Sequence, residues 1–247
     1  MLACARLWQL PMSAAARIAS TLLSPRAVLC LRLVYTEAMP RHAPGHREIE
    51  IKLRVSDVPA LLKRLRLLGA SCHGRVFEQN TLYDTPQSDL RRRFRLLRVR
   101  IETPAPTVLV LAGARNAVLT SKAPVGPSAS RSSAQRYKEK LECEVAIPHP
   151  KQFIRTLGSI GFRASFRYDK YRSSFRFRGL HLDLDETPVG VFLELEGTPR
   201  TIDRTARALG FSLRDYIRTS YWDLYAADCR RRGRNPKNML FRAQKNR

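Results

Sequence analysis

Short runs in which apolar and polar residues alternate recur along the chain and predict strands with one apolar and one charged face. In the first run, Glu48, Glu50 and Lys52 alternate with isoleucine and leucine. Successive side chains of a strand point to opposite faces, so these carboxylates lie on one face, about 6.5–7 Å apart. The same Glu-x-Glu pattern recurs at residues 142–144 and 194–196. A single pair would favour a solvated sheet face, but solubility alone does not explain three such strands, each backed by apolar residues.

Further alternating segments predict strands at residues 76–83, 96–101, 118–122, 168–177 and 181–185. Helical stripes with start and stop signals predict helices at about residues 56–69, 151–159, 201–208 and 215–228. Three times, a Glu-x-Glu strand is followed by a helix that ends in an apolar residue and a glycine, at residues 68–69, 160–161 and 209–210. This predicts a sheet of pseudo-repeats with helices packed on its apolar side.

The chain divides into three parts on composition. We expect residues 1–45 to form a disordered or targeting segment, residues 46–228 to form one domain, and residues 229–247 to form a basic, disordered tail. The composition of residues 1–38 fits an organellar transit peptide and also a non-native extension before a start at Met39, which we favour. No apolar run there reaches the length of a membrane span.

The charge of the chain points to a polyanionic partner. The formal net charge is +24, and the two end segments carry more than half of it, but the predicted domain is also basic. Such a balance suits nucleic acid, acidic lipid or a phosphate-rich small molecule. The five cysteines form no Cys-x-x-Cys pair and are odd in number, which indicates reduced thiols and a cytoplasmic protein. The histidines lack the spacing of a zinc site.

Charges on the predicted strands are sorted by sign. If helices cover the apolar face, the charged face is either open to water or curled inward as the lumen of a barrel. Carboxylates on one wall and bases on the other suit a complex of metal and polyphosphate, because carboxylates hold Mg²⁺ or Mn²⁺ and Lys/Arg bind phosphate oxygens. The acids are at positions 48/50, 142/144, 183/185 and 194/196, and the bases are at positions 52, 98/100, 122 and 170/172.

Seven short motifs, taken in order, resemble those of the CYTH superfamily. They are Glu48-Ile-Glu50-Ile-Lys52, Leu97-Arg98-Val-Arg100, Leu119-Thr-Ser-Lys122-Ala-Pro124, Glu142-x-Glu144, Lys170-Tyr-Arg172, Leu184-Asp185-Glu186 and Glu194-Leu-Glu196. The superfamily includes class IV adenylyl cyclases, thiamine triphosphatases and inorganic triphosphatases, also called triphosphate tunnel metalloenzymes. The resemblance spans roughly residues 46–228. It implies an α+β fold, in which an eight-stranded antiparallel barrel forms a tunnel and helices pack on its outside.

The resemblance also implies roles for individual residues. Metal ligands for Mg²⁺ or Mn²⁺ are implied at Glu48, Glu50, Asp185, Glu194 and Glu196. Phosphate binders are implied at Lys52, Arg98, Arg100, Lys122, Lys170 and Arg172, and Lys52 and Lys122 are the candidate catalytic residues. Glu142 and Glu144 match a further acidic strand that supplies either ligands or partners for the basic wall. Residues 103–115 depart from the family pattern as an insertion, which affects the register of Lys122, and their apolar run 107–111 is not assigned to any element.

The favoured function is a metal-dependent triphosphatase acting on a small triphosphate. An adenylyl cyclase is the alternative, but it needs a nucleobase pocket, and the sequence shows no signal for one. The arginines at 98 and 100 and the intact Glu194-x-Glu196 resemble the triphosphatase branch. A non-catalytic module that binds RNA or polyphosphate is the third candidate, and it should tolerate chelation of metal. Nucleic acid and membrane partners are not expected, although the basic tail suits polyanions, and a homodimer stays open.

Overall fold

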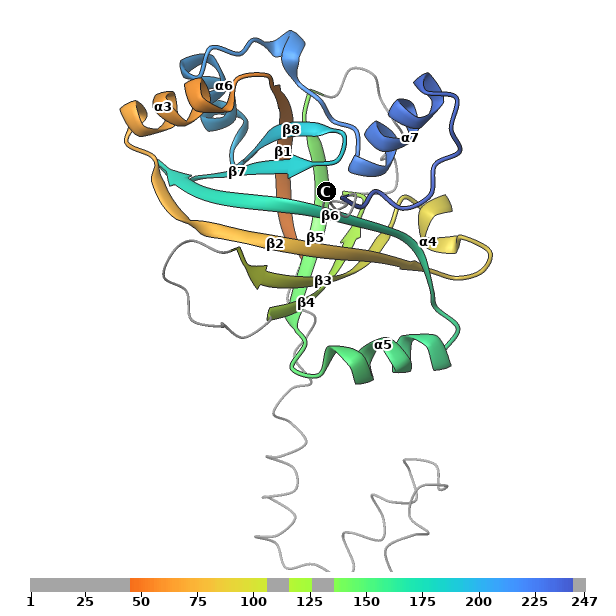
Figure 1. The fold of residues 1–247 in the computed structure, drawn as a ribbon. Coiled ribbons are helices and arrows are strands. Elements are labelled where there is room, and N and C mark those ends of the chain that lie inside the picture. Colours follow the sequence, from red (N-terminus) through yellow and green to blue (C-terminus); the bar gives the residue numbers. More distant parts are fainter. Residues whose placement is uncertain (1–44, 106–115, 126–135, 242–247) are drawn as a thin grey trace, which may run out of the picture. The chain divides into compact units, whose positions relative to one another are not determined.

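Eight antiparallel strands in the described part of the chain close into a barrel (Figure 1). The structure is a computed structural model, and it describes residues 45–105, 116–125 and 136–241. Around the barrel the order is β1-β5-β4-β3-β2-β6-β7-β8, after which β8 pairs with β1. The strands are β1 (His46–Val55), β2 (Ser71–Asp84), β3 (Leu96–Pro104), β4 (Asn116–Ala123), β5 (Lys138–Ala146), β6 (Arg163–Phe177), β7 (Leu180–Thr187) and β8 (Gly190–Glu196). The predicted α+β barrel is therefore confirmed.

Three of the helices follow the Glu-x-Glu strands, as the repeated pattern predicts. Helices α3, α5 and α6 come after β1, β5 and β8, and each is followed at its end by a glycine with positive φ. Glycine has no Cβ, so it adopts this left-handed conformation without strain and ends the helix. The helices are α3 (Val58–Leu68), α4 (Asp89–Arg92), α5 (Pro150–Ser159), α6 (Pro199–Ala208) and α7 (Tyr221–Arg231), with a 3₁₀ turn at Leu213–Asp215.

The main hydrophobic core lies outside the barrel, between its wall and two helices. Ile51 and Leu53 of β1 are fully buried there against Leu65 of α3 and Ile202 of α6. The alternate residues of β1 are the charged ones, which are also buried, on the opposite face of the strand. Packing the apolar face against helices thus turns the charged face of the wall toward the lumen.

The first strand closes the barrel by pairing with two strands that come much later in the sequence. Residues 46–50 of β1 pair with β5, and residues 50–55 pair with β8. Glu50 is opposite Lys138 in one register and opposite Glu196 in the other. This closure sets the acidic strands β1 and β8 side by side and places β5 on the other side of β1.

The segment after α7 packs on the barrel as far as Phe241, so the prediction of a disordered tail from residue 229 is wrong for residues 229–241. Residues 167–169 of β6 have no partner on β7, whose pairing with β6 starts at Tyr171. Met239 occupies that free edge, because its N–H donates to the Arg167 carbonyl at 2.9 Å and its carbonyl accepts from Asp169 N–H at 3.0 Å. The basic composition of the tail obscures the buried Met239.

An aromatic cluster lies where α7 and this segment meet the barrel. Phe166 and Tyr168 of β6, Phe192 of β8 and Tyr221 of α7 are buried together with Met239, which is 1% exposed. Tyr168 lies on the same face of β6 as Lys170, and Phe192 lies on the same face of β8 as Glu194, since each pair is two residues apart. The cluster therefore fills one end of the lumen.

A chain that ends at Arg230 should be less stable than the full chain, because the Met239 side chain leaves the aromatic cluster. Burial of a methionine contributes about 1.5–3 kcal/mol, and the loss should appear as a lower midpoint of urea unfolding. A chain that ends at Phe241 is the matched control and should unfold like the full chain. Equal midpoints for the two truncated chains would show that the segment contributes nothing.

Two features of the sequence fall outside the described residues, namely the segment 1–44 and the apolar run 107–111. The register of Lys122 is settled, because Leu96 of β3 pairs with Lys122 of β4. Among residues 45–105, 116–125 and 136–241, no helix combines the length and apolar character that crossing a bilayer requires.

Candidate active site in the barrel lumen

Ion pairs between strands that are not neighbours in the sheet show that the charged faces meet inside the barrel. Lys122 of β4 contacts Glu48 of β1 at 2.6 Å, and β5 lies between those strands. Likewise, Arg98 of β3 contacts Glu144 of β5 at 3.3 Å across β4. Arg172 of β6 contacts Glu194 of β8 at 2.5 Å across β7. Side chains of alternate strands reach one another only through the lumen, so the predicted acidic and basic strands share one interior.

Lys52 stands between two of the predicted metal ligands. Its Nζ is 3.2 Å from Glu50 Oε1 and 3.0 Å from Glu194 Oε1, and Lys138 also donates to Glu50. Burial alone would lower the pKa of Lys52, but Glu194 and Glu50 raise it above its ordinary value. Burial would likewise raise the pKa of Glu50, but Lys138 and Lys52 hold it well below its usual range. Lys52 is therefore a permanent cation at neutral pH, suited to bind phosphate.

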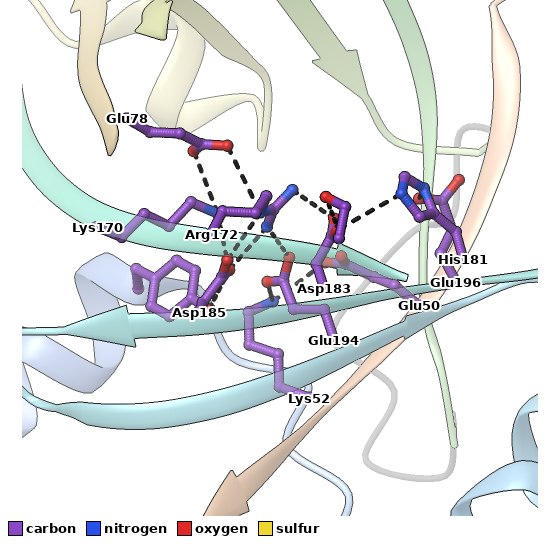
Figure 2. A network of polar contacts seen from close by, with 12 residues as sticks. Glu50, Lys52, Glu78, Lys170, Arg172, His181, Asp183, Asp185, Glu194 and Glu196 are labelled. Carbon is purple, nitrogen blue, oxygen red and sulfur yellow. Dashed lines mark hydrogen bonds and ion pairs between the residues drawn. The ribbon is translucent and has the colours of Figure 1, made fainter. Parts of the chain in front are cut away.

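Asp185 fixes the two basic residues of β6 (Figure 2). Its carboxylate is 0% exposed and accepts from Lys170 Nζ at 2.7 Å. Arg172 donates to both carboxylate oxygens, with Nε and Nη2 each at 2.7 Å. The Tyr221 hydroxyl donates to Oδ2 at 2.7 Å. Three of these contacts hold the charged ends of Lys170 and Arg172 in place, and the fourth anchors the carboxylate to α7.

Arg98 and Arg100 of β3 keep donors available. Arg98 donates to Thr120 at 3.0 Å and to Glu144 at 3.3 Å, and Arg100 donates to Glu102 at 3.3 Å. The Nε atoms of both arginines are buried without a hydrogen-bond partner. A buried donor without a partner is costly, so this wall of the lumen fits a ligand that supplies acceptor oxygens.

The walls formed by β1, β5 and β8 carry a surplus of carboxylates. Glu142 shares the ammonium group of Lys122, at 3.2 Å, with Glu48. Burial, followed by the charges of Glu48, Glu142 and Glu50, raises the pKa of Glu196 to about 7. An ionised Glu196 would thus meet several like charges, and a cation bound among these groups would relieve their repulsion.

The donor set fits a hard divalent ion. Among the described residues no three His, Cys, Asp or Glu side chains already converge on one point, because lysines engage these carboxylates instead. The negative charge around Glu196 would nevertheless attract a cation, and carboxylate oxygens are the ligands that Mg²⁺ or Mn²⁺ prefers. The residues that would hold such an ion are Glu48, Glu50, Glu194 and Glu196.

The lumen also contains residues that the motifs of the sequence do not include. Lys138 extends the alternation of β5 by two steps beyond Glu142, so the same pattern could have found it. Glu78 of β2 is fully buried among cations of β3 and β6, and its only local signal is the Glu78-x-Asn80 alternation. Tyr221 lies at the start of α7, and nothing in its neighbourhood of the sequence indicates contact with Asp185.

Comparison with known proteins agrees with the architecture. A protein of Methanocaldococcus jannaschii is 24% identical over 188 residues, which cover 72% of this chain and 97% of that protein. A solved structure from Vibrio parahaemolyticus covers 73% of this chain and 98% of its own, with 22% identity and a TM-score of 0.59. Both carry the name "putative adenylate cyclase". The PH1819 protein of Pyrococcus horikoshii has 23% identity and a TM-score of 0.59, and the match covers 73% of this chain and 99% of that one.

The similarity to the solved structures establishes the fold alone. The family follows from a separate finding, a match of the family model described as CYTH domain to residues 46–221. That range includes all eight strands of the barrel and the charged residues that line its lumen. The chain belongs to the CYTH domain family.

Proposed function

We propose that this protein is a divalent-metal-dependent triphosphatase that hydrolyses an inorganic or organic triphosphate inside the barrel. The observation that carries the proposal is the sorting of charge within one lumen. Carboxylates of β1 and β8 form one region, and cations of β3, β4 and β6 face it from the opposite walls. A linear, highly charged anion that brings its own metal ion matches both regions at once.

The basic residues bind and orient the phosphate groups. Arg98 and Arg100 offer planar donors, and Lys170 and Arg172 are held on β6 by Asp185. Lys52 and Lys122 add permanent positive charge where negative charge develops during phosphoryl transfer. When bound, a divalent ion supplies further charge neutralisation and lowers the pKa of a water molecule.

Cyclisation of ATP is the second candidate, favoured by the names of two relatives. It would require room for a nucleoside beside the triphosphate. The aromatic cluster of Phe166, Tyr168, Phe192 and Tyr221 fills the lumen next to Lys52 and Lys170, since the Tyr221 ring centroid is 5.3 Å from each ammonium nitrogen. A nucleoside would have to lie toward the other end, and hydrolysis has no such requirement.

One substrate screen tests the proposal and separates it from the alternatives. Inorganic triphosphate, thiamine triphosphate and ATP are each supplied with Mg²⁺ or Mn²⁺, and both phosphate release and cyclic AMP are measured. We expect phosphate release from at least one triphosphate and its complete loss in EDTA. Cyclic AMP as the main product would establish the cyclase instead. Tight triphosphate binding with no turnover under any condition would indicate a binding module.

A further inference from the structure

Glu78 is a carboxylate buried at the centre of the phosphate-binding wall. It lies on β2, between β3 and β6 in the barrel, and is 0% exposed. Lys170 Nζ is 3.4 Å from its carboxylate, Arg172 Nε is 3.5 Å away and Arg100 Nε is 3.6 Å away. Three of the residues expected to bind phosphate therefore surround a single carboxylate.

These contacts are long compared with those of Asp185. Lys170 and Arg172 are 2.7 Å from Asp185, in hydrogen-bonding geometry, whereas Glu78 Oε1 has no hydrogen-bond partner. Glu78 Oε2 accepts a hydrogen bond from the Asn80 amide at 3.2 Å. Asp185 thus fixes the cations in place, and Glu78 balances their charge without engaging their donors. Arg172 Nε already donates to Asp185, but Arg100 Nε has no hydrogen-bond partner and stays free to bind another anion.

We propose that Glu78 is a positioning residue that balances the charge of Arg100, Lys170 and Arg172 and thereby limits how tightly the lumen binds triphosphate and its products. The inference rests on the proposed function. Without Glu78, Asp185 and Glu102 would still pair with these cations, but the carboxylate between the three would be lost and a bound phosphate group would replace its charge. With Glu78 present, a bound anion shares the cations with a fixed carboxylate and is repelled by it. Weaker binding of the product allows its release.

The substitution Glu78→Gln tests this, because it keeps the shape of the side chain and removes its charge. Binding of tripolyphosphate and of diphosphate is measured by calorimetry in EDTA, so that no metal ion contributes. We expect both to bind about 10- to 50-fold tighter than to the wild-type protein. In turnover with metal, KM should fall, kcat should not rise, and diphosphate should inhibit at lower concentration. A purely structural role predicts the reverse, namely weaker binding and a higher KM.

Glu186→Gln is the matched control. Glu186 lies on the opposite face of β7 from Asp183 and Asp185, outside the barrel. Its carboxylate forms an exposed ion pair of 2.8 Å with Arg75. The net charge of the protein changes equally in both variants, so only Glu78→Gln should tighten anion binding. Equal tightening in the two variants, or none in Glu78→Gln, would overturn the inference.

Folding of the variant is tested separately, since removing one carboxylate from a buried group of ion pairs is destabilising. If Glu78→Gln does not fold alone, the comparison moves to Arg100→Gln with and without Glu78→Gln, where one cation fewer needs balance. The double variant should bind tripolyphosphate tighter than Arg100→Gln, and weaker or equal binding would contradict the proposal. If the wild-type protein binds neither anion, in EDTA or with Mg²⁺, the proposed function itself fails. If it binds both anions and Glu78→Gln binds them equally, only the role of Glu78 fails.

Discussion

Arg100→Ala should lower kcat/KM on the preferred triphosphate by about 30- to 1,000-fold, or about 2–4 kcal/mol of transition-state stabilisation. Arg100 has a buried Nε without a hydrogen-bond partner, and its contacts with Glu102 and Glu78 are long, at 3.3 and 3.6 Å. Its Nε is therefore free to bind a phosphate group in the lumen, and its bond to Glu102 is weak enough to be exchanged. Removing these donors should leave the protein folded, because Arg100 contributes little to the hydrogen bonds of the native state. Steady-state kinetics and a thermal melt measure the two effects.

The contrast with Glu50→Gln makes the Arg100 experiment specific. Glu50 is one of the residues that would hold the divalent ion, so its neutral variant should bind metal more weakly. A raised Mn²⁺ concentration should then restore part of the rate of Glu50→Gln and none of the rate of Arg100→Ala. Lys63→Ala, on the exposed side of α3, is the control and should behave like the wild type. If both lumen variants stay within a few-fold of the wild type on every triphosphate tested, the lumen is not the active site.

Asp185→Asn should have the largest effect on stability among single substitutions in the lumen. The carboxylate is fully buried and accepts from Lys170, Arg172 and Tyr221 at 2.7 Å each. Breaking a buried ion pair by removing one partner costs about 3–5 kcal/mol, because the remaining charges stay buried without compensation. For a domain of this size the melting temperature should fall by about 6–20 °C. Activity measured well below the melting temperature should also fall, since Lys170 and Arg172 lose the group that fixes them.

An exposed ion pair provides the reference for that measurement. Arg47 and Glu139 form a contact of 2.6 Å between β1 and β5, and more than half of the Arg47 side chain is exposed. Pairs of this kind contribute less than about 1 kcal/mol, so Glu139→Gln should barely change the melting temperature. A melting temperature for Asp185→Asn as high as that of Glu139→Gln would show that the contacts of Asp185 are dispensable.

Alternation in the sequence predicted the strands and their charged faces well. Glu48, Glu50 and Lys52 lie inside the barrel because the side chains between them pack on α3 and α6. The alternation of side chains between the two faces of a strand has a period of two residues, so it can be recognised without knowledge of distant parts of the chain. Closure of the sheet into a barrel depends on pairing between β1 and β8, and it was predicted only through the family resemblance.

Residues whose role depends on contacts distant in the sequence were missed. Glu78 acquires its three cations only when β3 and β6 flank β2, and a single glutamate in a strand gives no hint of that. Tyr221 reaches Asp185 from a helix that begins outside the barrel. The packing of Met239 could not be predicted from composition, because composition averages over a segment that is rich in arginine. A single buried side chain such as Met239 can nevertheless fix that segment on the barrel.

The pairing of β1 with two late strands has a consequence for folding on the ribosome. Both edges of β1 stay unpaired until β5 and β8 have been synthesised. Before then, the hydrophobic core around Ile51 and Leu53 is incomplete. Pairing between segments far apart in sequence is slow, and unpaired hydrophobic edges promote aggregation. The domain should therefore fold only after β8 has left the ribosome, as one late cooperative event. Nascent chains that stop before Gly190 should depend on chaperones to stay soluble.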